Sequence, residues 1–411
     1  MRWLRRIGFA LATIIAVLFT VWAAAALHFD LPVPPLRTPA SVLYLLVTLG
    51  ALLFLHRTHW GLVVAFVAFG IVALWWFSLK PSNNRAWRLD NAKTPYADVN
   101  GEQVTIHDLR NCNYRTEESY TCDWETRSYD LAALRGVDIF ITWWGSPWIA
   151  HPIVSFDFGD ENHVAMSIET RNVVGQGYSA IGGFFRQYTL AYIASDERDV
   201  IRLRTNYRKN EEVYLFRTTA KPLLARAIFL DYLERANRLH AGPEWYNALT
   251  NNCTTNIAVS VAEVRDIRVR LDWRILLNGK MDEMMYEDGE LVTGGLSFPA
   301  LKDQAHINQA ARSADDSFDF SRLIREGRIG FTEKTLTVEG PVQLFGENRN
   351  HSAGGERTGS SVGGSTLRCS KVANCSRVRG NRIQPLVPHA MEGFSAVHIR
   401  SLAVRAGRLS P

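Results

Sequence analysis

The 411-residue chain is poor in cysteine and lacks the short motifs of several common protein classes. It has five cysteines, no pair of CxxC motifs with zinc-ligand spacing, and no glycine-rich loop for a phosphate group. It also contains no internal repeat. These absences argue against a zinc ribbon and a nucleotide-binding protein, so the chemistry must be sought in single residues.

Aromatic residues and hydrophobic periodicity nearly disappear after residue 334, where Gly, Ser and Arg dominate. This composition predicts a disordered tail over residues 335–411. The tail carries ten Lys or Arg against four Glu, and the rest of the chain is close to neutral. The basic balance is therefore a property of the tail and predicts no nucleic-acid binding by the folded part. Such a tail either touches anionic lipid or has no function, as when it arises from a shifted reading frame.

Charged residues are absent from residues 7–27 and 60–79, and each stretch approaches the roughly 20 residues of a spanning helix. Residues 41–55 are apolar but short, so they span only with help from their flanks. Because Arg2, Arg5 and Arg6 precede the first stretch, a cleaved signal peptide is the alternative. With either interpretation, the positive-inside rule places residues from Lys80 onward outside the cytoplasm. We expect a membrane unit over residues 1–80, anchored in a bacterial inner membrane, and a periplasmic domain over residues 81–334.

The outer domain mixes two hydrophobic periods, which predicts an α+β fold. Strands are expected at "GVDIFITWWG", "IVSFDF", "HVAMSIETR", "DVIRLRTNY" and "EVYLFRT". A helix is expected over residues 221–240, a second one from residue 253, and one or two more in "DWRILLNGKMDEMMYEDG". In the fourth strand Arg202, Arg204 and Arg208 alternate onto one face, either as a solvated surface or as a cradle for a headgroup or carboxylate.

Cys112 and Cys122 flank the polar stretch "NYRTEESYT" and lie equally far from its midpoint. Across a hairpin they would face each other. Oxidising compartments keep such pairs closed, so we expect a disulfide. Cys253 is then the unpaired thiol of the folded region.

Cys253 stands in "LTNNCTTNIAVSV", where Asn251 and Asn252 are good N-cap residues. A thiol in the first turn of a helix feels the helix dipole, which favours the thiolate and a reactive nucleophile. The alternative is a small buried core residue. The β-branched residues that follow weaken the helix prediction.

A cysteine nucleophile needs a base, and two histidines qualify, His151 and His163. If "GDEN" is the turn, Phe158 pairs with His163 and His151 lies opposite Thr170. His151 then lies one residue out of register with Glu169, and a slip or bulge would bring both to one face. His163 falls beside the turn, where exposure is expected, so His151 is the preferred base.

A metal site is the alternative use of these histidines together with two aspartates. The spacing of the four residues matches no ligand pattern, so we expect neither a metal nor another cofactor. The four are His151, Asp157, Asp160 and His163.

The order of the parts, histidine on a strand and cysteine at a helix start a hundred residues later, resembles circularly permuted NlpC-type papain-like folds. These include acyltransferases of the lecithin retinol acyltransferase kind. Five segments between about residues 87 and 331 carry a closer resemblance: "IAHPIVSFDF", "SIETR", "GQGYSAIGGFFRQYTLAYIASDERDVIRLRTNYR", "VYLFR" and "WYNALTNNCTTNI". They resemble the Lnb N-terminal periplasmic domain family, named after a bacterial lipoprotein N-acyltransferase.

This resemblance implies a cysteine acyltransferase or acyl hydrolase that forms a thioester. Cys253 attacks an ester of a lipoprotein or phospholipid, His151 moves the proton, and Glu169 holds the imidazole. Asn252 and the backbone N–H of Thr254 support the oxyanion. The implied partners are the membrane and the acyl donor.

Two other function classes remain open on the sequence. A cell-wall peptidase or amidase of the NlpC type would use the same thiol chemistry and would need a groove for a peptide. A membrane-anchored scaffold module would bury Cys253 and leave it unreactive.

Peptide mapping without reduction should recover Cys112 and Cys122 as one linked pair from protein exported to the periplasm. The physical reason is the oxidising compartment, and the same digest after reduction is the control. Recovery of both as free thiols would contradict the disulfide and the compartment together.

Overall fold

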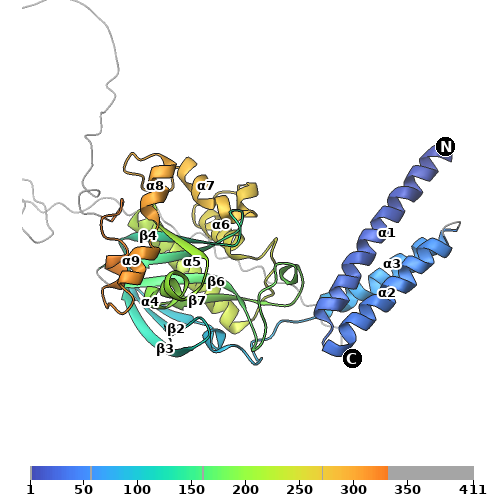
Figure 1. Ribbon diagram of the computed structural model, residues 1–411, viewed down its shortest axis with the longest axis horizontal. Helices are drawn as coiled ribbons and strands as arrows, with labels where there is room; N and C mark the ends of the chain where they lie inside the picture. The colour runs from blue at the N-terminus through green and yellow to red at the C-terminus, as the bar shows by residue number, and fades with distance from the viewer. Residues whose placement is uncertain (1, 56–57, 160–161, 271, 332–411) are drawn as a thin grey trace, which may run out of the picture. The chain divides into compact units, whose positions relative to one another are not determined.

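The computed structural model of the protein describes residues 2–55, 58–159, 162–270 and 272–331 (Figure 1). The expected tail at 335–411 and the aspartate at position 160 lie outside the described residues. Everything below concerns the described part of the chain.

Three N-terminal helices are long and apolar enough to cross a membrane. They are α1 (Arg2–Asp30), α2 (Pro34–Phe54) and α3 (Trp60–Ser78). The second begins seven residues earlier than the expected span, with proline in its first turn, and so reaches 21 residues. Small side chains, Ala23 and Ala26, are fully buried in the cluster that α1 shares with Val72 of α3, a packing that lets helix backbones approach closely.

The rest of the described chain is a mixed α+β domain built on one eight-stranded sheet. The order is β1-β2-β7-β6-β5-β4-β8, and β3 pairs with the other edge of β2. All pairs are antiparallel except β2 with β7. The strands are β1 (Tyr96–Asn100), β2 (Gln103–Tyr114), β3 (Tyr120–Asp130), β4 (Gly136–Trp144), β5 (Ala150–Asp157), β6 (His163–Arg171), β7 (Thr189–Ser195) and β8 (Glu211–Arg217).

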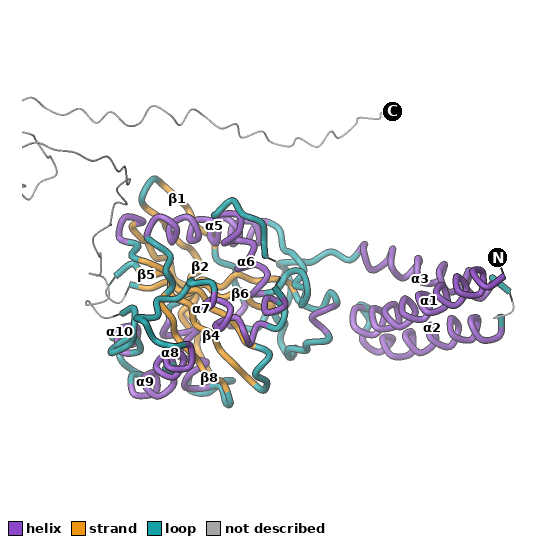
Figure 2. The backbone as a smooth tube through the Cα atoms, turned by 90° about the horizontal axis from the view of Figure 1, so that it is seen from above, coloured by secondary structure: helices purple, strands orange, loops and turns teal. Residues whose placement is uncertain are grey.

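Helices cover both faces of this sheet, as Figure 2 shows for α5 on one side and α9 and α10 on the other. The central strands are therefore buried on both faces, and every residue of β5 and β7 is buried. The helices are α4 (Glu197–Arg202), α5 (Pro222–Ala241), α6 (Cys253–Val264), α7 (Met281–Glu287), α8 (Phe298–Ala305), α9 (Asn308–Ser313) and α10 (Phe320–Leu323).

Alternation along the strands divides the core into two clusters. Val154 of β5 belongs to the cluster that contains residues of α5 and α6. Its neighbour Ile153 belongs to the cluster that contains Val200 and Ile201 of α4. We call these two sides the α6 face and the α4 face. Side chains of odd-numbered residues in β5 and β6 point to the α4 face.

The expected strand at 199–207 is wrong. This stretch forms the end of α4 and a π-helical turn, Leu203–Tyr207. Asp196 caps α4 by accepting a hydrogen bond from the backbone N–H of Arg198, which starts a helix where alternation suggested a strand. The arginines there are not a solvated face either, because Arg202 and Arg204 are buried.

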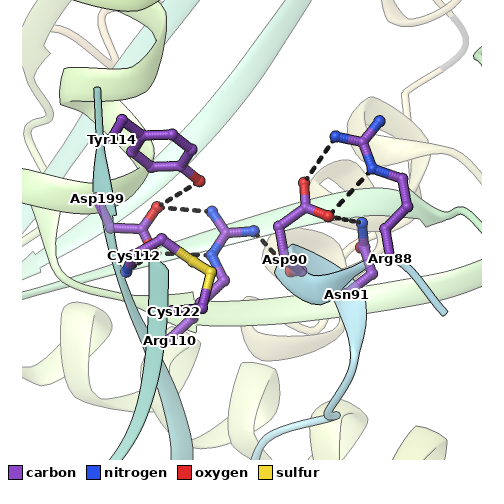
Figure 3. Close-up of a disulfide and its surroundings, with 8 residues drawn as sticks. All are labelled: Arg88, Asp90, Asn91, Arg110, Cys112, Tyr114, Cys122 and Asp199. Carbon is purple, nitrogen blue, oxygen red and sulfur yellow. Dashed lines mark hydrogen bonds and ion pairs between the residues drawn. A yellow bond between two sulfur atoms is a disulfide. The ribbon is translucent and has the colours of Figure 1, made fainter. Parts of the chain in front are cut away.

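The β2–β3 hairpin brings Cys112 and Cys122 directly opposite each other, and their sulfurs are joined in a disulfide (Figure 3). Beside it lies a buried ion pair between Arg110 of β2 and Asp199 of α4. The Asp199 carboxylate accepts from Arg110 Nε at 2.8 Å, from the backbone N–H of Cys112 at 2.9 Å and from the Tyr114 hydroxyl at 3.3 Å. One carboxylate thus ties the disulfide hairpin to the α4 face.

Asp199→Ala should lower the free energy of unfolding by about 3–5 kcal/mol, because the buried Arg110 guanidinium then loses the carboxylate that it is directly paired with. Denaturant unfolding of the detergent-solubilised protein measures the change. Glu102→Gln, which breaks a solvent-exposed pair with Arg226, is the matched control and should leave the stability nearly unchanged. Equal effects of the two substitutions would contradict a structural role for the buried pair.

Candidate active site

His151 and Glu169 lie on the α4 face at the same end of neighbouring strands. The observed register pairs Asp157 with His163 and Ile153 with Ser167. The expected pairing of Phe158 with His163 is therefore wrong by one residue. If the observed register is continued past Ile153, His151 lies directly across from Glu169. From the sequence alone, a one-residue slip was needed to reach this alignment.

A serine that sequence reasoning missed connects the two groups. The Ser167 hydroxyl donates to Glu169 Oε1 at 2.7 Å, and its oxygen lies 2.9 Å from His151 Nε2. Nε2 itself is 3.8 Å from Glu169 Oε1. A hydroxyl has one hydrogen, and the carboxylate takes it, so Nε2 must carry the imidazole proton. Nδ1 is then the basic nitrogen of His151.

Charge around this relay keeps the carboxylate ionised and the imidazole neutral. Burial lowers the pKa of His151 to about 3, with the nearby Arg204 adding to the effect and Glu169 opposing it. For Glu169, burial raises the pKa, but Arg204 and other cations outweigh it and hold the pKa well below its usual range. Arg204 lies 3.4 Å from Glu169 and 3.1 Å from Glu211. At neutral pH His151 is therefore a neutral imidazole with a free lone pair on Nδ1.

Cys253 is the first residue of α6, as the sequence predicts, and Asn252 is its N-cap. The Asn252 side chain accepts from the backbone N–H of Thr255, whose hydroxyl accepts from the N–H of Asn252. This reciprocal capping box starts the helix in spite of the β-branched residues. Asn252 therefore supports the helix end on which the thiol is carried.

The environment of Cys253 has the opposite effect on the thiol from the one expected of a helix start. The residue is 8% exposed, and burial raises the pKa of its thiol. Hydrogen bonds from Thr254 and from backbone N–H groups, and the charge of Arg204, lower the pKa but do not outweigh burial. The resting group is a neutral thiol.

Cys253 packs on the α6 face, whereas His151 and Glu169 point to the α4 face. Within the described part of the chain, no hydrogen bond or ion pair joins Cys253 to either histidine. Its sulfur lies 3.8 Å from the Thr254 hydroxyl and 3.8 Å from Asn278 Nδ2. The structure thus brings His151 and Glu169 together. The thiol of Cys253 lies on the other face of the sheet.

Asn278, a second residue that the sequence did not point to, connects the two sides. Its Nδ2 donates to the Thr254 hydroxyl at 2.7 Å, and its Oδ1 accepts from the backbone N–H of Ala150 at 2.8 Å. Ala150 precedes His151. The contact is possible because the β5–β6 register stops at Ile153, which leaves the start of β5 unpaired with β6. The amide of Asn278 therefore ties the start of α6 to the strand that carries the base.

His163 lies at the other end of the β5–β6 pair. It is buried, contrary to the expected exposure. Its Nε2 is 3.6 Å from Asp157 Oδ1, and Arg217 Nη2 is 2.7 Å from Asp157 Oδ2. Burial lowers the pKa of His163. His163 is six residues from Glu169 along β6. It therefore belongs to a different cluster from His151.

An apolar cavity of about 180 Å³ runs along the α6 face. It reaches the first turn of α6 at Thr254, the residue after Cys253, and continues between α6, α7 and the sheet. Its lining includes Thr254, Ile257, Val261, Val154, Met281 and Met285.

The histidines, Ser167, Glu169, Cys253 and Asn278 all fall inside one segment that matches a known family. Residues 120–279 match the family model of the Lnb N-terminal periplasmic domain. This is the family that the sequence resembles, and the match confirms the resemblance over that segment. No curated protein and no solved structure matches the chain.

Alkylation of Cys253 by iodoacetamide should be slower in the folded protein than in the urea-unfolded chain at neutral pH, and its rate should keep rising into the alkaline range. The reason is the raised pKa of the thiol, since the thiolate is the form that reacts. Mass spectrometry of the Cys253 peptide measures the rate. A plateau near neutral pH would contradict the prediction, because it would indicate a lowered pKa.

Proposed function

We propose that the protein is a membrane-anchored, periplasmic thiol enzyme that transfers acyl groups from lipid or lipoprotein esters. The match to the Lnb N-terminal periplasmic domain and the three membrane-capable helices support a site held beside a bilayer. The bilayer is the bacterial inner membrane. The order of histidine and cysteine on an α+β domain fits a permuted papain-like fold of the NlpC type.

The apolar cavity that reaches Thr254, the residue after Cys253, is the observation that carries the proposal. A hydrocarbon chain gains free energy when its surface leaves water, roughly 0.8 kcal/mol for each buried CH₂ group. A cavity whose lining is mainly methionine, valine, isoleucine and other apolar side chains offers that burial along the helix that carries the thiol. A peptide substrate would instead need polar partners for its backbone groups. The acyl chain therefore fits this cavity better than a peptidoglycan stem does.

In the first half of the reaction the sulfur of Cys253 forms a bond to the ester carbonyl carbon. The thiol proton passes to Nδ1 of His151 through water at the end of the sheet where the start of β5 is not paired with β6, so the contacts of the imidazole with Ser167 and Glu169 stay in place. Backbone N–H groups at the start of α6, including that of Thr254, stabilise the oxyanion. The ester C–O bond then breaks, and the leaving alkoxide takes the proton from His151. A thioester on Cys253 remains.

In the second half an amine attacks the thioester carbonyl and His151 accepts a proton from the amine. The C–S bond breaks, the thiolate recovers the proton, and an amide leaves the site. Water in place of the amine gives a fatty acid. Throughout, Glu169 and Ser167 hold the imidazole in one tautomer.

Cys253→Ala should abolish transfer from a diacylglyceryl ester in vesicles that contain the purified full-length protein, because no thioester can form. Glu169→Gln should lower the rate about 10²- to 10⁴-fold, the usual size of an acid–base contribution. Release of free acyl chain or amide product measures the rate, and intact-protein mass spectrometry detects the thioester.

His107→Gln is the matched control, since His107 also pairs with a carboxylate, Asp98, at 3.0 Å, but on β2. It should leave the rate unchanged. Cleavage of a peptidoglycan stem peptide with no acyl transfer would replace this proposal by the peptidase. Absence of both activities in folded protein would contradict an enzymatic function and support the non-catalytic scaffold module.

A further inference from the structure

Four large apolar side chains are exposed on the loop between β6 and β7 and on the neighbouring loop before α6. Val174 is 70% exposed, Ile181 63%, Phe184 42% and Leu249 51%. We call these four residues the apolar rim. Their exposure costs free energy in water, so a contiguous group of them marks a surface with a partner.

The backbone beneath the apolar rim is held by hydrogen bonds. The N–H of Ala248 donates to the carbonyl of Gly183 at 2.8 Å, which joins the loop of Phe184 to the loop of Leu249. The N–H of Val174 donates to Ala86 O at 2.9 Å. The loops of Phe184 and Leu249 are therefore joined, and Val174, at the start of the same β6–β7 loop, is held against the segment that follows α3.

The apolar rim is continuous with the membrane unit. Phe185, the residue after Phe184, stacks on Phe29 of α1 with ring centroids 4.9 Å apart and lies 6.4 Å from Trp22. The next backbone N–H, that of Arg186, donates to the carboxylate of Asp30 at 3.1 Å. Asp30 is the last residue of α1. The rim thus adjoins the end of an apolar helix.

Side chains typical of a membrane–water boundary meet at this junction. The Arg186 guanidinium lies 4.1 Å from the ring centroid of Trp76 in α3. Trp245, from the outer domain, donates through Nε1 to Leu79 O at 3.3 Å. Tryptophan and arginine favour the headgroup level, where an apolar body and a polar tip are both satisfied. Residues of the helices and of the outer domain therefore mark the same level.

We propose that the apolar rim inserts into the lipid bilayer that the three helices span. The apolar rim contacts the region where headgroups meet acyl chains. This surface of the outer domain continues the apolar surface of α1 and α3. Insertion removes the four side chains from water, as in proteins that lie in a membrane interface.

The apolar rim also adjoins the candidate site. Asn252 Nδ2 donates to the carbonyl of Ala248 at 2.7 Å, so the helix start that carries Cys253 is bonded to the loop of Leu249. A rim seated in the bilayer brings the opening of the site to the acyl chains. The insertion itself does not depend on the proposed function.

Site-directed spin labelling of the full-length protein in vesicles of phosphatidylcholine and phosphatidylglycerol tests the insertion. The background carries Cys253→Ser, Cys369→Ser and Cys375→Ser and keeps the disulfide. A nitroxide is attached at Ile181→Cys or Phe184→Cys. Because oxygen concentrates in lipid and a nickel chelate stays in water, collisions with oxygen should exceed those with nickel severalfold at both positions.

The matched control is Leu223→Cys, an 81% exposed leucine in the first turn of α5. The last turn of α5 bonds to Asn83, near the end of α3. Leu223 therefore lies about 24 Å along the helix axis from the end of α5 that contacts Asn83, from the helical rise per residue. Its label should favour nickel.

Labels at Ile181 and Phe184 that favour nickel as the control does would overturn the insertion. Labels shielded from both agents, with dipolar broadening between copies, would replace the bilayer by a second copy of the chain. Neither result bears on acyl transfer, which the Cys253→Ala comparison tests separately.

Discussion

The pairing register of β5 on β6 is the constraint on which the candidate site depends. Side chains alternate between the two faces of a strand, so a shift by one residue would move His151 or Glu169 to the wrong side of the sheet. The observed register, with Asp157 opposite His163, keeps both on the α4 face. The hydroxyl of Ser167 falls between them for the same reason, since it shares their parity. Backbone hydrogen bonds therefore decide which groups form the relay.

Buried ion pairs hold the α4 face in place. Glu169 keeps its charge in a largely desolvated position because Arg204 lies beside it. Farther along the same face, Arg325 joins two fully buried carboxylates, those of Asp138 and Glu197. Removing one member of such a pair leaves an uncompensated charge, so each residue fixes the position of its partner. The outcome is a rigid carboxylate that orients an imidazole, on a sheet face where ordinary cores have aliphatic side chains.

Local signals in the sequence predicted part of this arrangement correctly. The alternating segments became β4, β5 and β6, and Asn252 became the N-cap of α6. The strand predicted at residues 199–207 is wrong, although the sequence alternates there. The stretch is helical because Asp196 caps α4 and because Asp199 and Arg204 form buried ion pairs. The parity of Ser167 with Glu169 was visible in "HVAMSIETR" and could have revealed the relay. No local signal marks Asn278, because Ala150, one of its hydrogen-bond partners, is 128 residues away in the sequence.

The sequence by itself determined the apolar helices, the helix start at Cys253 and the resemblance to the Lnb N-terminal periplasmic domain, because each depends on neighbours within a few residues. Only the tertiary structure decided that Cys253 is buried on the α6 face, that its thiol pKa is raised, and that Asn278 joins it to the strand of His151. Desolvation and contacts between distant segments set these properties, and both arise only when the sheet and its two helical layers pack together.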